Sequence, residues 1–425
     1  MAPASLFTPP ADGRTPDPSL AHRHAEAEIT VLGPDGGRRT DTDVVVEQTR
    51  HEFLFGCIGF DFVDLACGTP RDVECEQRLA DLWFDVFNAT TLPFYWGRFE
   101  PEPGKPDTAR ILTTTRWFRE HGVVVKGHPL VWHTVCAPWL LALTNSDIER
   151  VTRERIRREV ADFAGVIDTW DAINEVVIMP VFEAEDNGIT RIARELGRIE
   201  MVRMAFEEAR VVNPSATLLL NDFDMSTAYE CLIEGVLEAG IRIDRLGLQS
   251  HMHQGYWGEE RTLAVLERFS RYNIPIHFTE TTLLSGDLMP SHILDLNDWQ
   301  VDDWPSTDEG EARQADEIER HVRTLLSHPS VEAMTYWGLS DRGMWLNAPG
   351  GLVRADGTPK PAYERLRNLV KDAWWMPPTP MRTDAEGRLR ISGFRGDYLL
   401  TVPDGGEARF ALAADNGGRV DAQIR

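Results

Sequence analysis

The sequence predicts an α/β fold, a (β/α)8 barrel, with a small β appendage formed by the N- and C-terminal segments. Between residues 53 and 375, eight short apolar segments alternate with amphipathic stretches. Polar and charged side chains directly follow several of these apolar segments, as expected where the parallel strands of a barrel end on one face. The segments before and after this region show alternating apolar residues and glycine turns, which are typical of antiparallel strands.

The N-terminal part of the chain divides into two segments. We expect residues 1–22 to be disordered, because they contain five prolines and almost no apolar side chains. Residues 23–52 predict a β-hairpin, since residues 27–32 and 42–46 alternate on either side of the turn at 33–37.

The barrel is predicted over residues 53–375. Its eight strands are expected near residues 53–59, 87–91, 123–127, 167–173, 217–221, 245–250, 276–279 and 333–337. Amphipathic helices are expected between them, for example over residues 147–163 and 190–212. A doubly wound open sheet is the alternative, but no GxGxxG sequence opens the first unit, so nothing supports nucleotide binding.

A proline cluster at residues 377–380 marks a boundary. Beyond it, residues 384–425 predict short strands at 389–391, 398–402 and 408–412, and we expect them to pack with the N-terminal hairpin. A structural cap on the barrel is the simpler role for this appendage, and carbohydrate binding is the alternative.

The composition excludes several classes of partner and cofactor. With 44 basic and 68 acidic residues, the net charge of −24 argues against nucleic acid and anionic membranes as partners. The five cysteines show no CxxC spacing, so neither a disulfide framework nor a structural zinc is expected, although Cys67 and Cys75 could pair. No cofactor is implied, and the sequence does not indicate an oligomeric state.

The N-terminus lacks the features of a signal peptide, and no apolar run reaches the length of a transmembrane helix. We therefore expect a cytoplasmic protein, or a secreted one if a leader has been trimmed from this sequence.

Two glutamates are the most informative residues of the chain. Glu175 and Glu280 each end a predicted buried strand, in DTWDAINE and IPIHFTE. Burying an ionised carboxylate is unfavourable unless it is paired, so two such strands suggest one site with two acids. Two acids that flank a bond are the machinery of glycoside hydrolysis.

Other strand ends add histidines, amides and tryptophans to the same face. They lie in GHPLVWH at 127–133, LLLNDFD at 218–224, GLQSHMH at 247–253 and WGLSDRGMW at 337–345. Sugar rings offer hydroxyls to polar groups and flat C–H faces to indoles, so this composition suits a sugar.

Together with WDAINE at 170–175, FTE at 278–280 and GLVRADGTPKPAY at 351–363, these motifs resemble glycoside hydrolase family 10, the endo-1,4-β-xylanase family. The resemblance covers about residues 53–372. It implies a retaining enzyme on a (β/α)8 barrel that acts on a β-linked oligo- or polysaccharide. The order and spacing of the motifs make it specific.

The resemblance also implies roles for single residues. Glu175 would be the general acid/base and Glu280 the nucleophile, with carboxyl groups about 5–5.5 Å apart. Asn174 would form a hydrogen bond with the sugar 2-hydroxyl, and His251 would form one with Glu280. The remaining residues expected to line the substrate are His128, Trp132, Gln249, Trp337 and Trp345. A cis peptide bond is expected at His128-Pro129, where proline lowers the cost of the cis form.

The chain also departs from the family pattern. Family members usually carry Glu-Asn-x-x-Lys-Trp after the second strand, whereas residues 90–96 here are two residues shorter and contain no acid, amide or lysine. Val135 stands in place of a glutamine, and Thr282 in place of an aspartate. These changes affect substrate recognition more than the reaction.

Cleavage of β-1,4-xylosidic bonds, with short imported oligosaccharides preferred to polymer, is therefore the main expectation. The same mechanism on another β-glycoside, such as an aryl or plant glycoside, is one alternative. A non-catalytic carbohydrate-binding protein is another. The HxH pair of His251 and His253 could bind a metal, but that motif follows the sixth strand here, whereas metal-dependent barrel hydrolases carry it on the first. No metal site is expected.

Overall fold

The computed structural model describes residues 17–414 and 418–425. These residues form two compact units, one of Leu54–Leu325 with Ser330–Arg365 and one of the remaining segments. Disorder was expected over residues 1–22, and residues 1–16 of this segment lie outside the described residues. From Pro18 to Arg23 the chain forms a 3-10 helix, and the Asp17 side chain caps its first turn by accepting a hydrogen bond from the backbone of Ser19.

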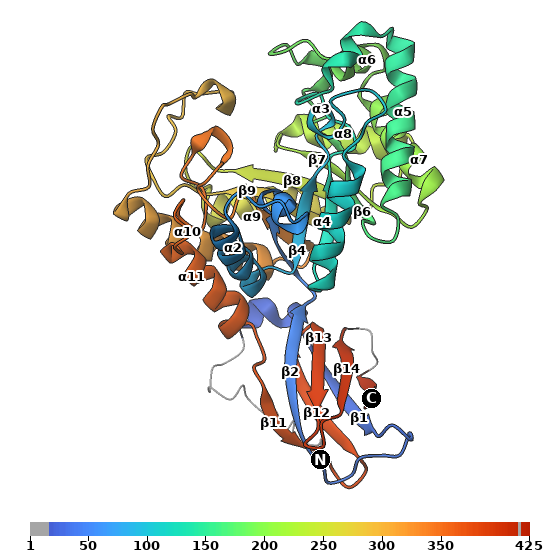
Figure 1. The fold of residues 1–425 in the computed structure, drawn as a ribbon, viewed down its shortest axis with the longest axis vertical. Helices are drawn as coiled ribbons and strands as arrows, with labels where there is room; N and C mark the ends of the chain where they lie inside the picture. The colour runs from blue at the N-terminus through green and yellow to red at the C-terminus, as the bar shows by residue number, and fades with distance from the viewer. Residues whose placement is uncertain (1–16, 415–417) are drawn as a thin grey trace. The chain divides into compact units, whose positions relative to one another are not determined.

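The larger unit is a closed barrel of eight parallel strands in the order β10-β3-β4-β5-β6-β7-β8-β9 (Figure 1). The strands are β3 (Leu54–Ile58), β4 (Ala89–Pro93), β5 (Val124–His128), β6 (Thr169–Asn174), β7 (Thr217–Asp222), β8 (Arg245–His251), β9 (Ile276–Thr282) and β10 (Val331–Tyr336). Each lies where the sequence predicts a strand. The pairing of β10 with β3 closes the sheet, so the alternative of an open doubly wound sheet is wrong.

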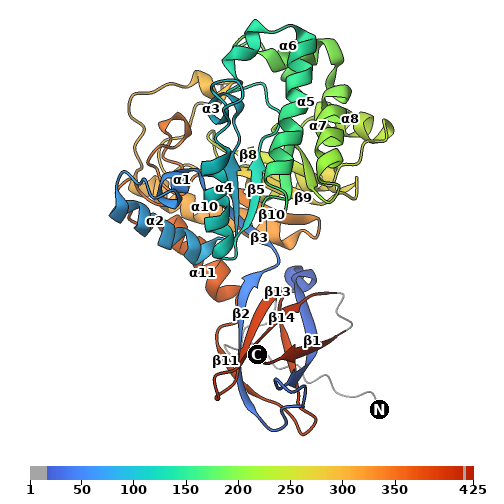
Figure 2. The same ribbon diagram turned by 45° about the vertical axis from the view of Figure 1, so that its right-hand side comes forward.

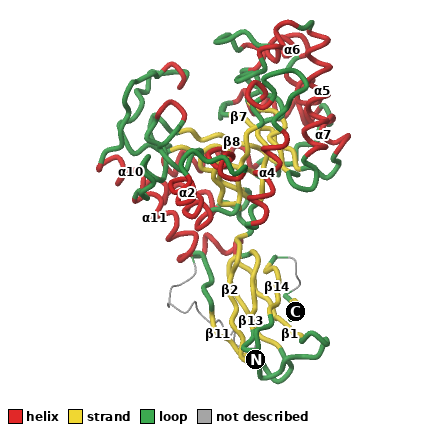
Figure 3. Tube along the Cα trace, in the orientation of Figure 1, coloured by secondary structure: helices red, strands yellow, loops and turns green. Residues whose placement is uncertain are grey.

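Helices connect successive strands and surround the barrel (Figures 2 and 3). They are α1 (Val63–Ala66), α2 (Val73–Val86), α3 (Trp96–Phe99), α4 (Thr108–Glu120), α5 (Asn145–Asp162), α6 (Gly188–Leu196), α7 (Arg198–Val212), α8 (Thr227–Glu238), α9 (Gly258–Ser270), α10 (Asp308–Ser327) and α11 (Pro361–Asn368), which continues as a π-helix over Leu369–Ala373. None of the helices in the described part of the chain is long and apolar enough to cross a bilayer.

Local sequence explains where α5 begins and why α6 and α7 are separate helices. Thr144 caps α5 by accepting a hydrogen bond from the backbone of Asp147, and its hydroxyl donates to the Asp147 carboxylate. The single helix predicted over residues 190–212 is instead two helices, α6 and α7. Gly197 has a φ of 80°, a conformation that glycine adopts without strain and that a helix interior does not contain.

The smaller unit contains two sheets that share one apolar core. The first has the strand order β12-β1-β15 and the second β11-β2-β13-β14. The strands are β1 (His24–Leu32), β2 (Asp43–His51), β11 (Thr379–Arg382), β12 (Arg388–Phe394), β13 (Gly396–Thr401), β14 (Glu407–Leu412) and β15 (Arg419–Gln423). Alternate residues of both sheets, such as Ile29, Val46 and Leu400, are buried in this core.

The prediction that the two ends of the chain form one β appendage is confirmed, because β1 pairs with β12 and β2 pairs with β13. The predicted hairpin over residues 23–52 is wrong, since β1 and β2 lie in different sheets. Alternation shows that a strand buries one face. It does not show which strand lies beside it, and here the turn at 33–37 leads from one sheet to the other.

Candidate active site

The carboxyl ends of the barrel strands bring the predicted site residues to one face of the barrel. Asn174 ends β6 and Glu175 follows it, His251 ends β8, and Glu280 lies near the end of β9. His128 ends β5, and Trp337 comes directly after β10. Because all eight strands are parallel, these ends share one face.

Glu175 is held by three side-chain donors. The Trp132 indole N–H donates to Oε2 over 2.8 Å, while the Gln249 and Asn174 amides donate to Oε1 over 3.2 and 3.3 Å. The backbone N–H of Glu175 donates to the Asn221 carbonyl, and its φ of 58° is uncommon for a residue with a side chain. Such strain persists only where the surroundings enforce it, and it is concentrated at functional sites.

Glu280 has a partner on each carboxylate oxygen. The Asn221 amide donates to Oε1 over 2.9 Å, and His251 Nε2 lies 3.1 Å from Oε2. The other ring nitrogen of His251 is 3.0 Å from the Thr282 hydroxyl. With Nε2 as the donor to Glu280, Nδ1 accepts from Thr282. The predicted contact between His251 and Glu280 is therefore present, and Thr282 fixes the histidine that makes it.

A chain of amides connects the two carboxylates. Asn221 donates both to Glu280 and to Asn174 Oδ1, the latter over 2.8 Å, and Gln249 donates both to Glu175 and to Asn174 Oδ1. The Thr279 hydroxyl donates to Asn221 Oδ1 over 2.6 Å and thereby fixes the orientation of that amide. We call Asn174, Asn221 and Gln249 the amide bridge.

Gly247 of β8 makes room for this bridge. A Cβ atom at this position would lie 2.3 Å from Asn221 Oδ1, far inside the contact distance of real atoms. Residue 247 must therefore be glycine for Asn221 to adopt its position. The sequence gives the position of the glycine, but only the packing of Asn221 against it explains why a glycine is needed there.

The two glutamates are both largely buried, with side chains 14% and 6% exposed for Glu175 and Glu280. Burial raises the pKa of Glu175 to about 8, and the nearby Glu280 and Asp222 carboxylates add to the rise, while the Trp132 hydrogen bond opposes it. Glu175 therefore carries a proton at neutral pH and can donate it.

Asp222, at the end of β7, is a buried acid close to Glu175. Burial raises its pKa to about 7, although backbone N–H groups of Val177 and Asp224 donate to its carboxylate and oppose the rise. Its hydrogen bonds all come from backbone, so it organises the loop that follows β6. We expect it to influence Glu175 through its charge.

Aromatic side chains lie beside these polar groups. The Trp337 ring is 5.2 Å from the His128 ring, and the Trp345 ring is 5.0 Å from the His251 ring. The Trp345 indole N–H donates to Asn297 Oδ1 over 3.2 Å, which ties it to the loop after β9. The structure thus brings Trp337 and Trp345 next to the histidines with which the sequence groups them.

The orientation of His128 is fixed by the buried ion pair of Asp171 and Lys126. Its Nδ1 lies 2.7 Å from Asp171 Oδ2, and the Lys126 ammonium donates to the same oxygen over 2.7 Å. Burial acts to raise the pKa of Asp171, but the Lys126 charge and these two hydrogen bonds hold it below its usual value. The peptide bond between His128 and Pro129 is cis, as predicted.

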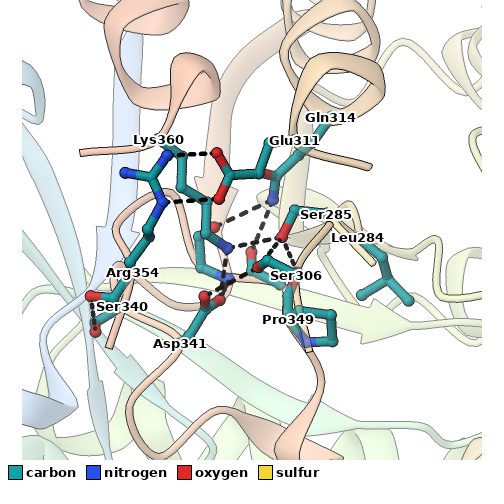
Figure 4. Close-up of polar contacts among 12 residues, drawn as sticks. Leu284, Ser285, Ser306, Glu311, Gln314, Ser340, Asp341, Pro349, Arg354 and Lys360 are labelled. Carbon is teal, nitrogen blue, oxygen red and sulfur yellow. Dashed lines mark hydrogen bonds and ion pairs between the residues drawn. The ribbon is translucent and has the colours of Figure 1, made fainter. Parts of the chain in front are cut away.

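Asp341 anchors the loop that carries the two tryptophans after β10 (Figure 4). It accepts from the Lys360 ammonium over 2.7 Å and from the Gly351 backbone over 2.9 Å. Lys360 is fully buried and also donates to Ser285 of the loop after β9. The ion pair therefore connects the loops after β9 and β10.

No group of three or more histidine, cysteine, aspartate or glutamate side chains arranged to hold a metal occurs within residues 17–414 and 418–425. The second histidine of the HxH pair, His253, is fully buried, and burial lowers its pKa to about 3, with His251 adding to the decrease. Its ring lies 5.2 Å from Trp345, so it packs beneath that indole.

Sequence reasoning placed Asn221 at the site face through the motif LLLNDFD but gave it no role, and it missed Thr279 and Tyr95 as site residues. Asn221 lies at the end of an apolar strand, the same signal that identified Glu175. Tyr95 follows β4, and its ring lies 5.6 Å from His128 and 5.5 Å from Trp132. It lies in the altered segment at residues 90–96, but the sequence gives it no role of its own.

The sequence of the chain is similar to those of known proteins over most of its length. The model of glycosyl hydrolase family 10 matches residues 93–369, which is more than half of the chain. Endo-1,4-beta-xylanase 3 of Hypocrea jecorina (strain Rut C-30) is 26% identical over 320 residues, covering 72% of this chain and 82% of that protein. Anti-sigma-I factor RsgI6 of Acetivibrio thermocellus is 26% identical over 309 residues, covering 70% and 36%.

The fold is also found among solved structures. Xylanase 10B from Thermotoga petrophila RKU-1, solved in complex with xylobiose, has a TM-score of 0.62 and 21% identity, and the match covers 76% of this chain and 95% of that one. At this identity the similarity establishes the barrel fold alone.

Proposed function

Because the chain belongs to glycosyl hydrolase family 10 and is a glycoside hydrolase, we propose that it cleaves β-1,4-xylosidic bonds in xylan or xylo-oligosaccharides. The reaction is a double displacement with retention of configuration. Glu175 is the general acid/base and Glu280 the nucleophile. The observation that carries this proposal is the amide bridge, which connects a protonated Glu175 to Glu280 through hydrogen bonds alone.

In the first step, Glu280 attacks the anomeric carbon while Glu175 gives its proton to the leaving oxygen. The raised pKa of Glu175, about 8, supports the acid role. Hydrogen bonds from Asn221 and His251 hold the two oxygens of Glu280 and aim the carboxylate. The bond from the anomeric carbon to the leaving oxygen breaks, and an ester to Glu280 forms.

In the second step, Glu175 takes a proton from water, and the resulting hydroxide releases the sugar from Glu280. Glu175 is ionised between the steps. The Trp132 indole and the Gln249 amide donate to its oxygens and stabilise this state. One residue thus acts first as an acid and then as a base. The carboxyl separation of about 5–5.5 Å that retention requires stays a prediction.

In this proposal, Asn174 hydrogen-bonds the sugar 2-hydroxyl. It lies next to Glu175, and Asn221 and Gln249 both donate to its Oδ1. Its Nδ2 has a longer hydrogen bond, 3.3 Å, to Glu175. That N–H group is the one available to strengthen a contact to substrate in the transition state.

A different β-glycoside, such as an aryl or plant glycoside, is the second candidate substrate. The observation that favours it is the short segment after β4, where Tyr95 contacts His128 and Trp132 and supplies an aromatic ring in place of charged groups. The catalytic steps are the same for both substrates. Which of the two substrates is cleaved depends on how the residues around the catalytic glutamates recognise the sugar.

The test is product analysis of xylohexaose with the wild type and with Glu280→Ala, combined with NMR of the anomer that is released first. We expect shorter xylo-oligosaccharides with β configuration from the wild type only. Release of the α anomer would overturn the double displacement. If xylohexaose is left intact but an aryl β-glycoside is cleaved, the second candidate replaces the first. Binding of the sugar without any turnover would instead indicate a carbohydrate-binding protein.

A further inference from the structure

Arg155 of α5 is a buried arginine whose guanidinium donates to two backbone carbonyls. The residue is 2% exposed, and its two terminal nitrogens donate to the carbonyls of Leu130 and Phe94. Leu130 lies in the segment after β5, and Phe94 lies in the segment after β4. The planar guanidinium presents its donors in a fixed fork, which suits two acceptors at once. One side chain therefore connects the segments that follow two neighbouring barrel strands.

Glu159 is a distant partner for the charge of Arg155. Its carboxylate lies 4.0 Å from Arg155 Nε, whereas it accepts a hydrogen bond from Arg158 over 2.7 Å. Burial lowers the pKa of Arg155, and the Glu159 charge opposes this decrease. A buried guanidinium is unfavourable unless it is hydrogen-bonded. Among the described residues, the hydrogen bonds of Arg155 are those to the two carbonyls, so fixing these carbonyls is what the buried charge does.

The segment that Arg155 holds through Leu130 also contacts Glu175. Its Val131 carbonyl accepts from the backbone N–H of the residue before Glu175 over 2.9 Å. The Trp132 indole N–H then donates to Glu175 Oε2 over 2.8 Å. Three consecutive residues of one segment therefore contact the guanidinium, the end of β6 and the Glu175 carboxylate. A shift of the Leu130 backbone moves the Trp132 indole relative to that carboxylate.

We propose that Arg155 is a positioning residue, which holds Trp132 against Glu175 by fixing the carbonyl of Leu130. The inference rests on the proposed function, in which Glu175 acts first as an acid and then as a base. The Trp132 hydrogen bond opposes the rise in the pKa of Glu175 and stabilises its ionised form. Arg155 thus supports the second step, in which ionised Glu175 takes a proton from water, and it acts through the backbone.

The test is the pKa of Glu175 in the full chain, measured by NMR titration of ¹³C-labelled glutamate carboxyl groups, with Glu175→Gln to identify the signal. This measurement does not depend on turnover. Arg155→Met keeps the length of the side chain and removes both hydrogen bonds. We expect the pKa of Glu175 to rise by about 0.5–1 unit, because a hydrogen bond to its ionised form weakens. The other titratable groups near Glu175 are Glu280, Asp222 and His133, and the substitution leaves them intact.

Trp132→Phe decides whether the effect passes through the indole. This substitution removes the hydrogen bond to Glu175 directly and should raise the pKa of Glu175 at least as much. Adding Arg155→Met to Trp132→Phe should produce no further rise, whereas a direct effect of the lost Arg155 charge persists in the double variant. The same rise in both backgrounds, or no rise in Arg155→Met alone, would overturn the inference.

Glu208→Gln is the matched control for loss of packing around α5. Glu208 accepts from Arg153 and Arg157 of that helix, so its substitution disturbs α5 but neither of the two carbonyls. The pKa of Glu175 should then equal that of the wild type. If Arg155→Met does not fold, Arg155→Gln takes its place with the same expectation, because its shorter side chain cannot reach both carbonyls.

Kinetics on a dinitrophenyl β-xyloside give a second readout. The leaving group needs no proton, so kcat/KM reports the first step without acid catalysis and kcat reports the second. For Arg155→Met we expect kcat to fall about 5- to 10-fold and kcat/KM to change by less than about 2-fold. Equal falls in both would contradict a role in the second step. If the wild type cleaves no glycoside, the proposed function fails, and the NMR titration still decides whether Arg155 positions Trp132.

Discussion

The amide nitrogen of Asn221 lies 2.9 Å from Glu280 Oε1 and donates a hydrogen bond to it. The same nitrogen donates to Asn174 Oδ1, beside Glu175. Asn221 is fully buried at the end of β7, so no water can substitute for it. One side chain therefore sets the position of Glu280 relative to that of Glu175.

We expect Asn221→Ala to lower kcat/KM by about 10²-fold, because Glu280 loses a donor to one oxygen and Asn174 loses one of its two. The measurement is steady-state kinetics on the cleaved substrate. Asn145→Ala, which removes an exposed amide that bonds Glu195, is the matched control and keeps full activity. Near-normal kcat/KM in Asn221→Ala would show that the amide bridge does not serve catalysis.

Activity on substrates with poor leaving groups should fall as the pH rises through about 8, because Glu175 must be protonated to act as the acid. An aryl glycoside with a dinitrophenyl leaving group needs no proton in the first step. For that substrate we expect the alkaline limb of kcat/KM to be absent or shifted to higher pH. Identical alkaline limbs for both leaving groups would exclude Glu175 as the proton donor.

Glu175 should also make stability depend on pH. Its pKa is about 8 in the folded protein and 4.5 in the unfolded chain, so the folded state binds the extra proton between these values. The unfolding free energy contributed by this group is therefore fully retained below about pH 4.5 and decreases as the pH rises to about 8. We expect Glu175→Gln to gain stability over the wild type at pH 8 and much less at pH 5, measured by urea denaturation. An equal difference at both pH values would contradict the assignment.

Breaking the buried ion pair of Lys360 and Asp341 should destabilise the barrel. Lys360→Met leaves Asp341 without its cation at a site where that carboxylate is only 17% exposed, which costs about 3–5 kcal/mol. The double variant with Asp341→Asn should recover part of this loss. Lys105→Met removes the exposed ion pair with Glu102 and should change stability by less than about 1 kcal/mol. Equal effects of the two lysine variants would argue against the anchoring role.

Gly247→Ala tests the packing of the amide bridge. The added Cβ would meet Asn221 Oδ1 at 2.3 Å and must displace it, so we expect kcat/KM to fall by more than about 10-fold in a protein that still folds. Gly235→Ala in α8 is the control, since its Cβ meets only the flexible end of Ile199, and activity should be unchanged. A crystal structure of Gly247→Ala with Asn221 in its original position would refute the explanation.

The barrel could be predicted from the sequence because its signals are local. Eight apolar segments separated by amphipathic stretches determine the strands, and a polar residue directly after such a segment marks the face where strands end. Glu175, Glu280 and His251 were found in this way, and their motifs identify the family. Alternation and glycine turns also predicted that the two ends of the chain form one β appendage, although not that this appendage has two sheets.

Other features depend on contacts between residues far apart in the chain, which no local pattern specifies. Alternation did not reveal that β1 and β2 belong to different sheets, because it shows burial of a face and not the neighbouring strand. Nor did the motifs show that Asn221 bridges to Glu280 or that the Tyr95 ring contacts His128 and Trp132. The pKa of Glu175 belongs to the same class, since it arises from burial and from charges that only folding brings close. The sequence by itself determined the kinds of groups in the site, and the tertiary structure decided their distances, their partners and their protonation.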